Sequence, residues 1–241
     1  MQEQLKKQIN DFIKTLIVQS GDNLVSAVLY GGYAKNDFTS GKSNVNILLI
    51  FENVNMQILD AISVTIQKGM VDFKLSPFIL TSSEVVPSSD VFAVKLFDIQ
   101  KHHILLHGED VLTTLQFDNK YLQFIAEQEL RNQLSRMKFY YIQHFNFPEA
   151  LLKKLQSGIT TLLVNANTYL YLKYGIYLET RAEITQRILL EKQMNKESLL
   201  ILLSLRNPPD AINPNQIKQG YDLLMLEYKH LVKELKVVFN G

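Results

Sequence analysis

Two short apolar runs, joined by a long polar loop, constrain the fold of this chain more than any other feature. The runs are Leu24–Tyr30 (LVSAVLY) and Val45–Phe51 (VNILLIF), and both contain β-branched and aromatic residues. Runs of this length and composition are typical of buried strands. The first run ends at the double glycine Gly31-Gly32, where the chain can turn at little steric cost. The sequence therefore predicts two buried strands with a glycine turn and a polar loop between them.

The loop contains the triplet Gly41-Lys42-Ser43, which resembles the end of a phosphate-binding loop. The full motif is G-x-x-x-x-G-K-[ST], and its first glycine would fall on Asn36 in this chain. The motif also requires a helix directly after the triplet, because the helix N-terminus binds the phosphates. Here the run Val45–Phe51 follows, and it predicts a strand. The sequence therefore argues against a phosphate-binding loop of this type.

The segments around these runs predict a mixed α/β half. A single apolar stripe from Leu5 to Ile17 predicts a helix over about residues 2–19. A second, moderately amphipathic helix is expected over residues 56–68. Alternating apolar and polar residues predict a half-buried strand over residues 71–76, ending near Pro77. A further strand is expected at Val91–Phe97, and an apolar stretch follows at 103–106.

From Tyr121 onward the hydrophobic pattern is helical. Helices are expected over residues 121–145, 148–174, 181–193, 196–205 and 214–238, and prolines or glycine separate most of them. Five helices with short connections are typical of a compact bundle. We therefore predict an α+β protein. A mixed sheet with helices is expected over residues 1–118, and an all-helical bundle domain over residues 119–241.

Composition narrows the classes of function. Lys and Arg number 25 against 24 Asp and Glu, so the net charge of +1 argues against nonspecific nucleic-acid binding. The absence of cysteine excludes disulfides and thiolate metal sites. The N-terminal residues lack the apolar core of a signal peptide, and no run approaches the roughly 18 apolar residues that span a bilayer. We therefore expect a cytoplasmic protein without a membrane partner.

The order of strand, Gly31-Gly32, polar loop, Ser43-Asn44-Val45-Asn46 and apolar strand resembles the signature of the nucleotidyltransferase superfamily. That superfamily includes the aminoglycoside nucleotidyltransferases. The resemblance covers order and spacing over roughly residues 5–51, and a helical bundle after the catalytic domain is familiar there too. It implies a nucleotidyltransferase-like N-terminal domain. It also implies an acid–apolar–acid triplet after the serine, whose carboxylates hold Mg²⁺ against the nucleotide phosphates.

Asn44 and Asn46 stand where the resemblance implies the two acids. The strand period of two places both side chains on one side of the sheet, as a metal site requires. An asparagine carbonyl can bind a hard cation but brings no negative charge, and Mg²⁺ prefers anionic ligands. We therefore expect no metal and no cofactor, with Mg²⁺ involved only if activity is retained. The resemblance also implies a third acid from a later strand. The strand expected at 91–97 would place Lys95 there in one register and Asp90 or Asp98 in the other, and Lys95 is the favoured residue.

These observations predict a degenerate nucleotidyltransferase-like protein, a pseudoenzyme without transferase activity. Nucleotide or phosphate binding could persist through the backbone amides of Gly31 and Gly32, together with Lys35, Lys42 and Ser43. One alternative is an active nucleotidyltransferase that uses Asp37, Asp90 or Asp98. Another is a non-enzymatic interaction protein, in which the helical domain docks a partner or a second copy of the chain as a homodimer.

Two further groups of residues attract functional interpretations. His102, His103 and His107 could bind a metal, but a role as ordinary surface or turn histidines is favoured because no acid occupies a suitable helical position. Glu127 and Glu129 open the first helix of the bundle, and in some relatives the helical domain lends a catalytic base. A surface ion pair between Glu127 and Arg131, four residues apart, is the simpler interpretation.

Overall fold

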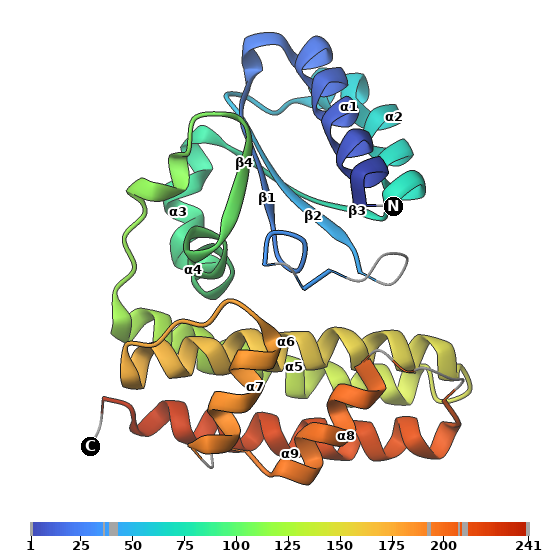
Figure 1. Ribbon diagram of the computed structural model, residues 1–241, viewed down its shortest axis with the longest axis vertical. Coiled ribbons are helices and arrows are strands. Elements are labelled where there is room, and N and C mark those ends of the chain that lie inside the picture. Colours follow the sequence, from blue (N-terminus) through green and yellow to red (C-terminus); the bar gives the residue numbers. More distant parts are fainter. Residues whose placement is uncertain are drawn as a thin grey trace. The chain divides into compact units, whose positions relative to one another are not determined.

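The computed structural model describes residues 2–35, 37–38, 43–191, 194–206, 208 and 212–239. The chain divides into two compact units, residues 1–116 and 117–241. The first unit is a four-stranded mixed sheet with helices, and the second is helical, so the predicted α+β class is confirmed (Figure 1). No described helix is both long and apolar enough to cross a membrane.

The sheet of the first unit has the strand order β3-β2-β1-β4. Strand β1 is antiparallel to both β2 and β4, whereas β2 and β3 are parallel. Helices α1 and α2 cover one face, and α3 and α4 lie on the other (Figure 1). The strands are β1 (Leu24–Tyr30), β2 (Val45–Phe51), β3 (Leu75–Thr81) and β4 (His103–Gly108), and the helices are α1 (Gln2–Ser20), α2 (Met56–Phe73), α3 (Ser82–Val91) and α4 (Ala93–Lys101).

Alternate residues of the strands form the core beneath α1 and α2. Ile47 and Leu49 of β2 pack there with Leu29 of β1, and the α1 stripe that includes Phe12 and Leu16 completes this core. Because successive strand residues point to opposite faces, Asn46 and Leu48 lie on the face of α3 and α4. The predicted strands at 24–30 and 45–51 are confirmed.

The strand predicted at residues 91–97 is wrong, because this segment contains the last residue of helix α3 and the first five residues of helix α4. Apolar residues crowd this segment, and a short apolar run cannot distinguish a strand from a buried helix. The informative signal lies earlier: Thr81 and Glu84 form a capping box that starts α3. Lys95 is therefore a residue of helix α4.

The strand predicted at residues 71–76 is also misplaced. Helix α2 continues to Phe73, and Lys74 ends it in the left-handed conformation at φ 55°, donating its N–H to the Gly69 carbonyl. Strand β3 begins only at Leu75 and contains Pro77. The proline is tolerated because β3 is an edge strand of the sheet, where one side needs no hydrogen-bond donors.

The second unit confirms the five predicted helices. They are α5 (Asn119–Gln143), α6 (Pro148–Tyr174), α7 (Arg181–Leu190), α8 (Lys196–Arg206) and α9 (Pro214–Val237). Helices α5, α6 and α9 pack against one another, and α7 and α8 pack on this trio. Two buried tyrosines of α9 link it to α6, since Tyr221 donates to the Leu151 carbonyl at 3.2 Å and Tyr228 to the Gly158 carbonyl at 2.7 Å.

Candidate functional site

The double glycine forms a tight turn at the end of β1. Gly31 has φ 72°, and a Cβ at this position would lie 2.7 Å from the Asn46 Nδ2 atom. The chain then folds back, because the Lys35 N–H donates to the Gly31 carbonyl at 3.0 Å and the Asp37 N–H to the Gly32 carbonyl at 2.7 Å. Glycine is therefore required at position 31 both by the left-handed backbone and by the neighbouring side chain.

The triplet Asn44-Val45-Asn46, called the asparagine triplet below, lies directly beside this turn. Asn46 is half-buried in β2 and pairs with Tyr30 of β1, the residue before the glycines. Asn44 precedes the strand and is exposed, and Ser43 is partly buried. The structure thus brings Gly31 and Asn46 together, as the nucleotidyltransferase resemblance implies. Lys42 lies outside the described residues.

On strand β3, Ser76 is the residue beside Asn46, whereas Lys95 lies on helix α4. Strand β3 runs parallel to β2, and Ser76 is the register partner of Asn46. Paired residues of neighbouring strands share a face of the sheet, so Ser76 is the later-strand residue beside the asparagine triplet. The sequence interpretation missed Ser76, because only the register of a parallel pair joins residues 30 positions apart.

Lys95 nevertheless reaches this face of the sheet from helix α4. Its ammonium lies 3.5 Å from the ring centroid of Phe78 on β3 and 5.8 Å from that of Tyr30 on β1. A cation over an aromatic face is stabilised by the negative face of the ring. The residue is exposed, whereas its neighbours Val94 and Leu96 are buried and fix the helix against the sheet.

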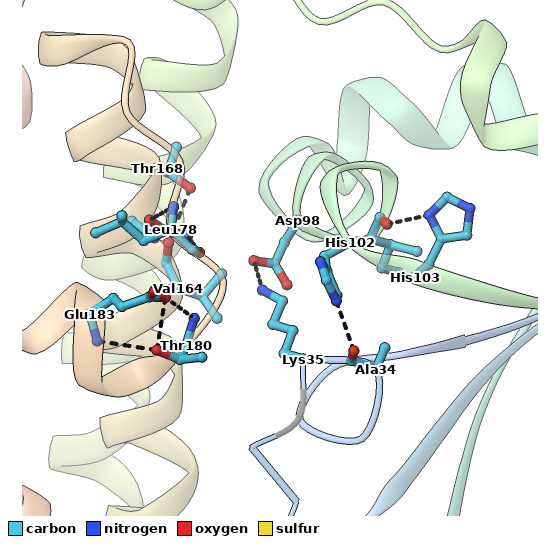
Figure 2. Close-up of polar contacts among 12 residues, drawn as sticks. Ala34, Lys35, Asp98, His102, His103, Val164, Thr168, Leu178, Thr180 and Glu183 are labelled. Atoms are coloured by element: carbon cyan, nitrogen blue, oxygen red, sulfur yellow. Dashed lines mark hydrogen bonds and ion pairs between the residues drawn. The ribbon is translucent and has the colours of Figure 1, made fainter.

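A buried ion pair fastens helix α4 to the glycine turn. The Lys35 ammonium lies 2.6 Å from Asp98 Oδ1, and their side chains are only 10% and 13% exposed. His102, directly after α4, donates its Nε2–H to the Ala34 carbonyl at 2.7 Å (Figure 2). Burial raises the pKa of the Tyr30 phenol, and the charge of Asp98 raises this pKa further. The turn and the helix therefore form one polar cluster in which Tyr30 stays neutral.

Several of the other sequence candidates have local partners. His103 contacts the Ile99 carbonyl at 2.8 Å through Nδ1 and Asp110 at 3.0 Å through Nε2. Asp90 is exposed on α3, and Asp37 and His107 are half-buried. In the helical unit, Glu127 pairs with Arg131 at 2.7 Å, and Glu129 accepts a hydrogen bond from buried Asn165 at 3.1 Å. Over the described ranges, no three acidic or histidine side chains gather in a way that could hold a metal.

Among the residues that the structure describes, the side chains beside the turn do not fit a magnesium ion. Asn44, Asn46 and Ser76 offer neutral oxygens, and the ammonium of Lys95 brings positive charge to the same face. Mg²⁺ gives up its water reluctantly and binds proteins through carboxylates and substrate phosphates. The carboxylate of Asp98 on helix α4 is already bound to Lys35.

Comparisons with known proteins bear on the fold. No protein-family model and no curated protein matches the sequence. Among solved structures, the chain is similar to a spectinomycin adenyltransferase from Enterococcus faecialis, crystallised with ATP and spectinomycin. The TM-score is 0.66 at 12% sequence identity, and the match covers 96% of this chain and 99% of the other. The chain therefore has a nucleotidyltransferase-like fold followed by a helical region. A shared fold does not by itself carry an activity.

Proposed function

We propose that this protein is a nucleotidyltransferase-like protein that has lost metal-dependent transfer and retains a site for a nucleotide or another phosphate ligand. The observation that carries the proposal is that neutral side chains lie beside Gly31, where the resemblance implies acids. Asn44 and Asn46 occupy the triplet, and Ser76 is the register partner of Asn46. Mg²⁺ is usually held by one or two protein carboxylates together with the substrate phosphates, and neither asparagine supplies a carboxylate.

Binding of phosphate without a metal is compatible with the same residues. The backbone amides of Gly31 and Gly32 and the Ser43 hydroxyl are donors of the kind that bind phosphate oxygens. Lys35 is a poor candidate as a direct ligand, because Asp98 already balances its charge at 2.6 Å. The similarity to an adenyltransferase that binds ATP supports the choice of nucleotide as the first ligand to test.

The first test is a transfer assay. Purified protein is incubated with ATP, Mg²⁺ and a panel of aminoglycosides and spectinomycin, and mass spectrometry detects any adenylylated product. We expect no product. A Mg²⁺-dependent product that disappears in Asn44→Ala would contradict the proposal. A product that persists in Asn44→Ala and disappears in Asp98→Asn would instead identify an active enzyme with non-standard acids.

The second test is binding. Calorimetry with ATP is performed once in EDTA and once in excess Mg²⁺, and the melting temperature is recorded under both conditions. We expect binding in EDTA. Failure of ATP to bind or to stabilise the protein under both conditions would remove the retained phosphate site from the proposal.

A second candidate function is protein interaction through the helical unit. The end of α5 and the turn after it expose four large apolar side chains, and Ile142 and Phe139 are 75% and 69% exposed. Phe145 belongs to this group and also lines a hollow of about 380 Å³ with Tyr141, Leu151 and Ile217. Exposed apolar side chains that form a contiguous patch are typical of association sites. The group consists of Phe139, Ile142, Phe145 and Phe147.

A second copy of the chain is the partner to test first, by light scattering. If this group forms a homodimer, Phe139→Glu and Ile142→Glu should convert dimers into monomers. Val64→Glu is the matched control, because Val64 is also exposed but lies on α2 of the other unit. A wild-type protein that is monomeric at high concentration would exclude the homodimer.

A further inference from the structure

The sheet register locates the Lys95 ammonium within the site. Tyr30 pairs with Asn46 across β1 and β2, and Phe78 pairs with Leu48 across β2 and β3. Strand β2 lies between the other two, so a group close to both rings lies above β2 itself. The ammonium is 3.5 Å from the Phe78 centroid and 5.8 Å from the Tyr30 centroid. It therefore lies over the segment of β2 that contains Asn46.

Two sets of contacts fix helix α4, and with it the backbone of Lys95, against the sheet. Its apolar residues Val94, Leu96 and Phe97 are buried against the first unit. At the other end, Asp98 binds Lys35 and His102 binds the Ala34 carbonyl, which ties the helix to the glycine turn (Figure 2). Lys95 is exposed between these anchors, so a ligand from solvent can reach it.

We propose that the ammonium of Lys95 takes the place of a metal ion, so that the site binds the polyphosphate chain of a nucleotide without a divalent cation. This inference rests on the proposed function, because it assigns the charge that the phosphate site needs. A polyphosphate requires positive charge where its oxygens meet the protein, and a lysine ammonium supplies it as a fixed point charge with three N–H donors. In this arrangement, the positive charge of the site comes from the protein's own Lys95 and not from a bound metal ion, so Asn44 and Asn46 can be neutral.

A lysine ammonium in place of a metal ion would explain why positions 44 and 46 carry no acids. A carboxylate at position 46 would bring negative charge to the face of the sheet that Lys95 reaches and would repel the incoming phosphates. An amide at that position can donate a hydrogen bond to a phosphate oxygen and carries no negative charge that would repel it. A neutral amide at position 46 therefore suits a site whose positive charge comes from Lys95, just as an aspartate would suit a site that binds Mg²⁺.

The test compares two lysines of the same helix. Lys95→Met keeps an unbranched side chain over Phe78 and removes the charge. Lys101→Met is the matched control, because the Lys101 ammonium also lies over a ring, 5.2 Å from the Phe97 centroid. Lys95→Arg keeps the charge. Binding of ATP and of inorganic triphosphate is measured by calorimetry in EDTA and in Mg²⁺, and melting curves confirm that each variant is folded.

We expect wild-type protein, Lys101→Met and Lys95→Arg to bind ATP in EDTA, and Lys95→Met to bind about tenfold or more weakly. Added Mg²⁺ should not strengthen binding to the wild type. Equal affinity of Lys95→Met and wild type in EDTA would overturn the role of Lys95 and leave the proposed function intact. Binding of wild type only in Mg²⁺, or no binding at all, would overturn both. Inorganic triphosphate binding with the same Lys95 dependence would show that the phosphate chain is the recognised group.

Discussion

Gly31 and Asn46 are coupled residues, since the space above one is filled by the side chain of the other. The backbone at Gly31 has φ 72°, and the Asn46 amide occupies the position that a Cβ would need. The double glycine was recognisable in the sequence as a turn, but its dependence on residue 46 requires the pairing of β1 with β2. A substitution at position 46 is therefore expected to affect the turn at Gly31, and a substitution at Gly31 is expected to displace the side chain of residue 46.

Replacing Gly31 with alanine should destabilise the protein more than the same change at Gly21. Both glycines have positive φ, 72° and 54°, so each alanine pays a backbone cost of about 1–2 kcal/mol. At Gly21 no atom lies within 4 Å of the added Cβ, whereas at Gly31 the Asn46 amide must move. We expect an additional cost of about 1–3 kcal/mol at Gly31, measured by urea denaturation. Adding Asn46→Ala should relieve this excess, and equal costs for the two glycines would refute the coupling.

The Lys35–Asp98 pair should behave as one unit in a double-mutant cycle. Each side chain is nearly nine-tenths buried, so Lys35→Met or Asp98→Asn alone leaves a buried charge without its main partner. We expect each single change to lower the free energy of unfolding by about 2–4 kcal/mol. The double variant should cost less than the sum by about 1–3 kcal/mol. Additive costs would show that the short contact contributes no coupling.

At the scale of elements, the sequence predicts helices and strands well where one pattern extends over the whole element. Both strands around the glycine turn and all five bundle helices are recovered, because their periodicity is uninterrupted. The helices α3 and α4 were missed, since each is short and the pair contains Pro87 and an apolar stretch that also fits a strand. Lys95 was singled out for a reason that proved wrong, yet α4 brings it to the same face of the sheet.

Helix α9 carries a carboxyl group that should make stability depend on pH. Glu227 is 1% exposed, and within the described part of the chain its Oε2 has no hydrogen-bond partner. Burial raises the pKa of Glu227, and the charge of His230 and hydrogen bonds from Ser198 and Asn195 offset this only in part. The unfolded chain releases the proton near pH 4.5, while the folded chain keeps it to higher pH. The free energy of unfolding therefore falls as the pH rises above about 4.5, until the folded pKa is passed.

Glu227→Gln mimics the protonated carboxyl and should remove this decline. We expect the variant to be more stable than wild type at pH 7 and to lose this advantage at pH 4. Urea denaturation between pH 4 and 8 measures the difference. Asp222→Asn, an exposed position on the same helix, controls for loss of one carboxylate. A constant difference between wild type and Glu227→Gln across the pH range would contradict the assignment.

At the scale of the whole molecule, the candidate site is defined by sheet topology more than by local sequence. Asn46 and Ser76 meet because β2 and β3 are parallel neighbours, and helix α2 provides the crossover between them. No local pattern reports which strands become neighbours, so Ser76 could not be identified from its surroundings in the chain. The asparagine triplet and the double glycine could be identified, because both lie in one short segment with a recognisable spacing of residues.

The two units should unfold in separate steps, since each has a core of its own. Leu49 is fully buried in the sheet unit, and Leu162 is fully buried in α6 of the helical unit. Truncation of such a leucine to alanine costs about 2–5 kcal/mol, which lowers the melting temperature of its own unit by roughly 10 °C. We expect calorimetry of the full chain to show two transitions, with Leu49→Ala shifting one and Leu162→Ala the other. ATP in EDTA should raise the transition that Leu49→Ala lowers, because the proposed phosphate site lies in the sheet unit. A single transition that both variants shift together would instead show that the chain unfolds as one cooperative body.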